Sequence, residues 1–423
     1  MDINVGLIDA DLLDNGTRHP NLALMKISTF CKTFGKTKLL YTDEDVNNIN
    51  NYDVIIISKV FNYTKLNPVI IDSLKKTNLS YTRLNECIFK LMNNFEKKFH
   101  GKTLFAIGGT GFFPNGGVNL HPVIEHTFPD YELYSEYIQF KIKEGRSETY
   151  FNDYLNFSIG FTTRGCFRKC DFCVNKKYSR CTLHSPVSEF IDPERSKVYL
   201  WDDNVFACKD WELVFDQLDR TNKPFQFRQG LDIRLLTEKK AKRLAQSKYY
   251  GDVIFAFDHV DDYNIIDRRL KIWRKYSKKT TKLYLICAFD PWEYNGIKCR
   301  PLKKSEQFLK EMSELKTQES RDQKDIEGLF IRIELLMKYR CHPYIMRYEK
   351  YKDSKYRGMY IQLARWCNQP QFYKKMSFRE FCNAHQRYSK GTKLCSSMKA
   401  MIEFEKDRPD IAKKYFDIKY ENY

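Results

Sequence analysis

Short apolar runs alternate with amphipathic stretches over residues 1–125. In residues 22–34 the apolar side chains recur at the three- and four-residue spacing of a helix with one buried face. The other runs are continuously apolar, which is typical of parallel strands buried on both faces. They are NVGLI (4–8), KLLYT (38–42), DVIIIS (53–58) and TLFAIGG (103–109). This alternation predicts an open, doubly wound α/β domain.

The last of these runs ends in a glycine-rich turn, Gly108-Gly109-Thr110-Gly111. A doubly wound sheet presents its ligand loop at such a strand end, but tight turns use glycine for conformational reasons alone. Both interpretations stay open. The residues that follow, 126–153, are polar and contain proline, and we interpret them as a linker.

From residue 154 the alternation starts again and is more regular. Six apolar runs follow, at FSIGFTT (157–163), KVYLW (197–201), FQFRQGLDIRL (225–235), DVIFAFD (252–258), KLYLICAFD (282–290) and HPYIMRY (342–348). Six such units predict a partial (β/α)6 barrel over residues 154–350, with its chemistry at the carboxyl ends of the strands. The rest, 351–423, is expected to be a basic helical region.

The chain carries a formal net charge of +18. Residues 334–423 hold 20 Lys and Arg against 10 Asp and Glu, so they account for +10 of it. A basic surface attracts polyanions such as nucleic acid, and aromatic rings among the cations suit the stacking of unpaired bases. A solvated, lysine-rich surface over packed helices explains the same pattern. Nucleic acid as a partner is therefore one of two interpretations.

The first residues, MDINVGLIDADLLDNG, lack the basic and apolar regions of a secretion signal. No segment approaches the roughly 18 consecutive apolar residues that a membrane span needs. We therefore expect a soluble, cytoplasmic protein with no membrane partner. In a reducing compartment its 13 cysteines are expected to be buried, metal-bound or catalytic.

Three cysteines lie close together after the first run of the second half, in GCFRKCDFC (165–173), here called the cysteine loop. They are Cys166, Cys170 and Cys173, spaced as C-x3-C-x2-C. Such short spacings let thiolates reach one inorganic centre, and both zinc and iron–sulfur clusters prefer thiolates. Three ligands leave one iron of a cluster open to a substrate or cofactor. A zinc site needs a fourth ligand, for which Cys181 and His184 are the nearby candidates.

The cysteine loop, with Phe172 directly before its last cysteine, resembles the C-x3-C-x-aromatic-C signature of the radical S-adenosylmethionine (radical SAM) superfamily. In that superfamily the signature follows the first strand of a partial (β/α)6 barrel. The resemblance implies a [4Fe–4S] cluster on the three cysteines, with S-adenosylmethionine bound to the open iron. Reductive cleavage then gives methionine and a 5′-deoxyadenosyl radical. It also implies an electron donor such as a flavodoxin or ferredoxin.

Polar residues stand at the ends of the later strand runs, where a barrel places its ligand contacts. Asp202, Asp203 and Asn204 follow the second run, and a carboxylate there suits the ammonium group of a ligand, or else caps a helix. The remaining candidates are Arg228, Asp232, Asp258, Asp290 and Glu293.

The Asp-Asp-Asn sequence and the domain before the barrel resemble the class B branch of radical SAM enzymes, which carries an N-terminal cobalamin-binding domain. The Asp-x-His-x-x-Gly motif that ligates cobalt in several cobalamin proteins is absent before residue 150. Domains with and without bound cobalamin both stay open. His19 is expected to cap a helix and not to bind metal.

The sequence thus predicts a radical SAM enzyme whose substrate is unknown. Methyl or methylthio transfer to nucleic acid, protein or a small molecule competes with hydrogen abstraction or rearrangement. Outside this class, the alternative is a zinc-stabilised nucleic-acid-binding protein without catalysis.

Overall fold

The chain forms two compact α/β units built on parallel sheets. The computed structural model describes residues 3–76, 82–83, 103–113, 119–170, 172–289, 317–387 and 393–423. The first unit comprises Met1–Phe167, Cys173–Asp202 and Glu212–Phe225. The second comprises Arg168–Phe172, Asp203–Trp211 and Gln226–Tyr423. Among the described residues, none of the helices has the length and apolar character that a membrane crossing requires.

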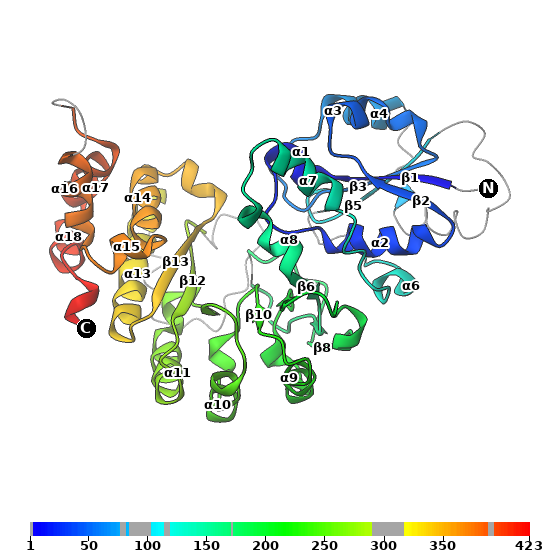
Figure 1. The fold of residues 1–423 in the computed structure, drawn as a ribbon. Helices are drawn as coiled ribbons and strands as arrows, with labels where there is room; N and C mark the ends of the chain where they lie inside the picture. The colour runs from blue at the N-terminus through cyan, green and yellow to red at the C-terminus, as the bar shows by residue number, and fades with distance from the viewer. Residues whose placement is uncertain are drawn as a thin grey trace. The chain divides into compact units, whose positions relative to one another are not determined.

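The first unit begins with a parallel sheet of strand order β2-β1-β3-β5-β4 (Figure 1). Its strands are β1 (Ile3–Asp9), β2 (Gly35–Leu39), β3 (Val54–Ser58), β4 (Thr82–Arg83) and β5 (Leu104–Gly108). Three of the four runs expected to be strands over this part of the chain coincide with β1, β3 and β5. The fourth, 38–42, shares only its first two residues with β2, which begins earlier, at Gly35. The order reverses beside β1, which is the arrangement of an open, doubly wound sheet.

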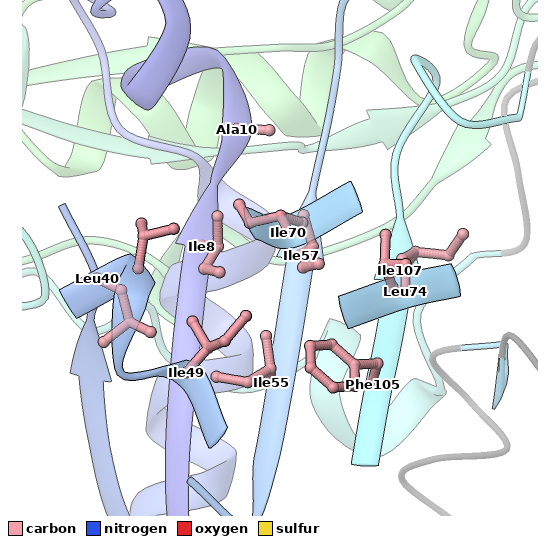
Figure 2. Close-up of a cluster of buried hydrophobic side chains, with 11 residues drawn as sticks. Ile8, Ala10, Leu40, Ile49, Ile55, Ile57, Ile70, Leu74, Phe105 and Ile107 are labelled. Atoms are coloured by element: carbon pink, nitrogen blue, oxygen red, sulfur yellow. The ribbon is translucent and has the colours of Figure 1, made fainter. Parts of the chain in front are cut away.

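Helices cover both faces of this sheet. One face packs on α2 (Leu22–Lys32) and α6 (Pro122–Glu125). The other packs on α3 (Asp43–Asn47) and α4 (Pro68–Lys76), and Figure 2 shows side chains of neighbouring strands directed at those helices. Successive strand residues point to opposite faces, so runs that are apolar at every position serve both layers. The short α1 (Ala10–Asn15) follows β1 directly.

The segment expected to be a linker is instead part of the packed first unit. It contains α7 (Ser135–Lys143) and η2 (Glu148–Phe151), and α8 (Asn152–Asn156) follows. Their aromatic rings pack with Leu12, Met25 and Leu39. Polar residues separate these rings along the chain. The segment therefore has no continuous apolar run, and its buried face is not evident from the sequence.

Each of the six strand runs expected after residue 154 contains a strand. They are β6 (Phe157–Gly160), β9 (Lys197–Leu200), β10 (Phe225–Phe227), β11 (Val253–Ala256), β12 (Thr281–Cys287) and β13 (His342–Arg347). They form two sheets, of order β10-β9-β6 and β11-β12-β13. The third run was expected to be long, but β10 ends early because Gly230 has a left-handed φ of +86° and Asp232 caps the 3-10 helix η5 (Ile233–Leu235).

Helices alternate with these strands. They are α9 (Trp211–Arg220), α10 (Glu238–Gln246), α11 (Tyr263–Tyr276) and α13 (Gln318–Lys338). After β13 the described residues continue with α14 (Arg357–Cys367), α15 (Pro370–Tyr373), α16 (Phe378–Arg387), α17 (Ser396–Asp407) and α18 (Pro409–Tyr415). Their inner faces bury Trp366, Phe378 and Phe404, so much of the aromatic content of the tail is core.

Candidate functional site

The cysteine loop begins at a closed base in the first unit. The strands β7 (Thr163–Arg164) and β8 (Thr182–Leu183) pair antiparallel on either side of it. Gly165, directly before Cys166, has φ +95°, and a Cβ there would lie 2.3 Å from the backbone oxygen of Arg180. Only glycine fits this position, because it accepts both the left-handed backbone and the close approach.

Asp202 fixes the backbone that leads into the loop. Its carboxylate, 1% exposed, accepts hydrogen bonds from the backbone N–H groups of Thr162 (3.1 Å) and Thr163 (2.6 Å) and from both hydroxyls (2.5 and 2.6 Å). Burial raises the pKa of Asp202, and these hydrogen bonds oppose the shift. The carboxylate thus has a full set of protein donors, which makes it a positioning group for the loop.

In the second unit, the middle of the cysteine loop is tied to the end of β10. Arg168 forms an ion pair with Asp232, whose other oxygen accepts from Arg234 at 2.8 Å. Arg234 also pairs with Asp262 at 2.9 Å, and it lies within electrostatic reach of Cys170. Burial would raise the pKa of Asp232, but the two guanidinium groups outweigh it and hold that pKa below its usual value.

Two further predicted residues join this group. The side-chain amide of Asn204 donates a hydrogen bond to Asp232 at 3.5 Å. Asp258 interacts electrostatically with Arg234 and Asp232. We call the set the strand-end cluster. It consists of Arg168, Asn204, Asp232, Arg234, Asp258 and Asp262. These residues come from the cysteine loop and from the segments after β9, β10 and β11, as expected for the carboxyl ends of parallel strands.

Asp258 differs from the other carboxylates of the strand-end cluster. Among the described residues, no group donates a hydrogen bond to its side chain, and burial raises its pKa to about 6. Its backbone oxygen accepts from Arg332 at 2.7 Å, and the same guanidinium nitrogen bonds the backbone oxygens of Phe257 and Ile286, at 3.1 Å each. A carboxyl beside a strand end, with a raised pKa and no hydrogen-bond donor to its side chain among the described residues, is a candidate for ligand contact.

Phe172 lies against the ends of two more strands. Its ring centroid is 6.2 Å from that of His259, after β11, and 5.7 Å from that of Phe289, after β12. Phe289 in turn contacts Tyr348, after β13, at 4.9 Å. The second unit therefore gathers Phe172 and the strand-end cluster from four loops.

The remaining predicted site residues are not part of the strand-end cluster. Arg228 donates to Gln226 at 3.4 Å and acts electrostatically on Tyr249 and Tyr284. Asp203 is half-buried at the end of β9. Asp290 and Glu293 are outside the described residues.

All three cysteines of the loop are half-buried, and within the described residues none of them forms a disulfide. This donor set suits an iron–sulfur cluster with three protein ligands. Within the described ranges, no three His, Cys, Asp or Glu side chains are grouped closely enough to hold a metal ion. The assignment of one cluster to these thiols therefore depends on their number, their spacing and their place in the loop.

His184, a candidate fourth zinc ligand, belongs to a different network of the first unit. Its Nδ1 bonds Ser185 at 3.0 Å, its Nε2 lies 3.5 Å from Glu125, and its ring stacks on His126. Burial, reinforced by Arg164, lowers the pKa of His184 to about 4. The ring is therefore neutral at pH 7 and faces a carboxylate.

The carboxyl ends of β1 and β3 in the first sheet are filled by protein groups. The Tyr134 hydroxyl donates to Asp9 at 2.9 Å, and Asn21 donates to Ser58 at 2.8 Å. Asn21 also caps α2, so the expectation that His19 caps a helix is wrong. The His19 ring instead packs edge-on against Trp201, at 4.9 Å.

The glycine-rich turn after β5 is explained by packing. Gly109 has φ +101°, and a Cβ there would lie 2.2 Å from the backbone oxygen of Lys59. Gly111 donates to that same oxygen at 2.9 Å. The glycines of this turn are therefore explained by backbone conformation and close packing, without a bound ligand.

Three site residues were missed from the sequence: Arg168, Arg234 and Arg332. Arg168 lies between Cys166 and Cys170, and Arg234 lies two residues after the predicted site residue Asp232. Their proximity to predicted site residues in the sequence could have identified both arginines. Arg332 lies inside α13, and nothing in its local sequence points to the strand ends it bonds.

No protein-family model matches the chain, and no curated protein matches it. Among solved structures it is similar to the radical S-adenosylmethionine methyltransferase TsrM from Kitasatospora setae with cobalamin and a [4Fe–4S] cluster bound. That similarity has 10% identity and a TM-score of 0.45, over 82% of this chain and 75% of that one. A second structure of TsrM, with tryptophan substrate and a SAM analogue, gives the same identity and TM-score over 81% and 73%.

A further similar structure is OxsB, a cobalamin-dependent S-adenosylmethionine radical enzyme. It has 12% identity and a TM-score of 0.32, over 82% of this chain and 49% of that one. TsrM and OxsB are both described as S-adenosylmethionine radical enzymes.

Proposed function

We propose that this chain is a radical SAM enzyme, with a partial (β/α)6 barrel over residues 154–350 that holds a [4Fe–4S] cluster and S-adenosylmethionine. The observation that carries the proposal is the cysteine loop itself, in which three thiols spaced C-x3-C-x2-C follow the parallel strand β6 and the short strand β7. Support comes from the strand-end cluster, because Arg168 and Cys170 of the same loop lie with charged groups from the following strand ends.

In this proposal Cys166, Cys170 and Cys173 would hold the cluster through their thiolates. The bound cluster would supply one electron, received from a flavodoxin or ferredoxin, for reductive cleavage of S-adenosylmethionine to methionine and a 5′-deoxyadenosyl radical, which would take a hydrogen atom from the substrate. Asp202 and Gly165 hold the base of the loop, and the Arg168–Asp232 pair holds its middle. We assign Asp258 to contact with a cationic group of the cofactor or substrate.

The test is anaerobic reconstitution with iron and sulfide, followed by dithionite and S-adenosylmethionine. We expect broad absorbance from a [4Fe–4S] cluster and formation of 5′-deoxyadenosine. Replacing any one of the three loop cysteines with Ala should remove both signals. The matched control is Cys181→Ala, a nearby cysteine outside the loop, which should keep both.

Two results would overturn the proposal. Stoichiometric zinc without iron in anaerobically purified protein would support the zinc-stabilised nucleic-acid-binding alternative. A loaded cluster that yields no 5′-deoxyadenosine with dithionite would exclude radical SAM chemistry while leaving the cluster in place. A flavodoxin or ferredoxin is the class of donor expected to replace dithionite.

We also propose methyl transfer, with cobalamin in the first unit, as the reaction to test first within this class. A sheet of this doubly wound order binds ligands outside the carboxyl ends of its strands. Protein groups fill those ends at β1 and β3, so a corrin would bind elsewhere in this unit. S-adenosylhomocysteine formed alongside 5′-deoxyadenosine, together with a stoichiometric corrin spectrum after reconstitution with hydroxocobalamin, is the expected result. 5′-Deoxyadenosine alone, without corrin, would indicate hydrogen abstraction or rearrangement instead.

A further inference from the structure

A cavity of about 430 Å³ lies in the second unit at the amino ends of β12 and β13. The loop before β12, the end of α13 and the first residue of β13 line it. β12 has seven residues, and at ~3.3 Å per residue the strand is roughly 20 Å long. The cavity is therefore at the opposite end of the strands from the strand-end cluster.

The lining of this cavity is strongly cationic. We call it the basic cavity, and its cations are Arg274, Lys278, Lys279, Lys338, Arg340 and Lys374. None of the described residues that line it is a carboxylate. Just outside, Asp267 pairs with Lys338 at 3.2 Å and accepts from the Tyr339 hydroxyl at 2.9 Å. The six cations of the lining therefore give the cavity a positive excess.

The two arginines of the basic cavity connect the segments that line it through hydrogen bonds to backbone oxygens. Arg274 donates to the backbone oxygens of Tyr339 (2.8 Å), Lys279 (2.9 Å) and Arg340 (3.1 Å), and so joins the loop before β12 to the end of α13. Arg340 donates to the backbone oxygen of Tyr420 at 3.0 Å. The shape of the cavity is thus fixed by hydrogen bonds and does not depend on a ligand.

Two lysines of the basic cavity are available to a ligand. Lys278 and Lys374 are exposed, and within the described part of the chain neither side chain has a hydrogen bond or ion pair. His342 lines the same cavity, is 4% exposed, and has no partner for its Nε2 among the described residues. Burial lowers the pKa of His342 to about 4, so the cations alone set the charge at neutral pH.

We propose that the basic cavity binds phosphate groups of a polyanionic ligand, either a single-stranded nucleic acid or a free polyphosphate. Lysine ammonium groups without carboxylate partners favour phosphate oxygens. The aromatic side chains of Tyr339 and Tyr420 line the same cavity. Because the cavity is far from the strand-end cluster, it anchors the ligand and does not take part in its chemistry. This inference does not depend on the cysteine loop or its cofactors.

The test uses the full-length chain with two probes, a fluorescently labelled oligouridine and inorganic tripolyphosphate. The variant Lys278→Glu with Lys374→Glu should weaken binding at least about tenfold, since two phosphate contacts become repulsive. The matched control is Lys399→Glu with Lys413→Glu, two exposed lysines of the same unit outside the cavity. It makes the same change in net charge and should weaken binding less than about threefold.

The pattern of results identifies the ligand. Oligouridine binding that tripolyphosphate competes away places strand phosphates in the basic cavity, and tripolyphosphate binding alone indicates a free polyphosphate. Both outcomes support the site if only the cavity variant loses binding. Equal losses in the two variants would show diffuse surface attraction and overturn the proposal, as would wild-type protein that binds neither probe. Because no catalytic signal is measured, failure here leaves the radical SAM proposal standing.

Discussion

At the scale of single residues, Asp258 gives the clearest electrostatic expectation. Its pKa is raised to about 6 by burial, against ~3.9 for an unfolded aspartate. The folded chain therefore holds the proton more tightly, and the stability that this gives below pH 4 is lost as the pH rises through 6. We expect Asp258→Asn to increase the free energy of unfolding by about 2 kcal/mol at pH 8 and to change it little at pH 4.

Urea denaturation of wild type and variant at the two pH values measures this difference, on protein without cofactors. An equal gain at both pH values would show that the aspartate acts through packing and not through its charge. Asp232 is expected to behave in the opposite way, because its two arginines lower its pKa. Removal of the Asp232 carboxylate should therefore decrease the free energy of unfolding at pH 8.

At the scale of elements, the segment 126–153 matters because it stabilises the first sheet. The Tyr134 hydroxyl, at the start of α7, donates to Asp9 at 2.9 Å and accepts from the Asn21 N–H at 3.0 Å. Tyr134→Phe leaves a buried carboxyl without its hydroxyl donor, and should lower the free energy of unfolding by about 2 kcal/mol.

The matched control for this prediction is Tyr137→Phe on the same helix. Tyr137 is 5% exposed, and its hydroxyl makes no hydrogen bond among the described residues, so the change should cost less than about 0.5 kcal/mol. Thermal or urea unfolding of both variants measures the contrast. Similar values for the two would mean that ring packing, and not the Tyr134 hydroxyl, connects α7 to the sheet.

Most strand positions were predictable from the sequence because buried parallel strands have apolar residues at nearly every position. The exception is β2, GKTKL, whose alternating burial hides it from this pattern, so that the predicted run 38–42 overlaps only its last two residues. The partners of polar residues were not. Asp202 was expected to face a ligand, yet its donors are Thr162 and Thr163, about forty positions earlier, brought close by the pairing of β6 with β9. The tyrosines of 126–153 were hidden for the same reason, since their contacts with β1 and α2 are distant in sequence.

At the scale of the whole molecule, neither compact unit is a continuous piece of chain. The chain passes between the units within the cysteine loop and again between Asp202 and Gln226. The loop proposed to hold the cluster therefore contributes residues to both, Cys166 and Cys173 to the first and Cys170 to the second.

This organisation also predicts which N-terminal fragments fold. A fragment of residues 1–125 lacks α7 and α8, so Leu12, Met25 and Leu39 lose the aromatic side chains that cover them. A fragment of residues 1–156 keeps those side chains. We expect the longer fragment to melt cooperatively in circular dichroism and the shorter one to show no cooperative transition, because its exposed apolar face favours aggregation. A cooperative melt of the shorter fragment at the same temperature would show that the segment 126–153 adds no stability to the first sheet, and would restore its interpretation as a linker.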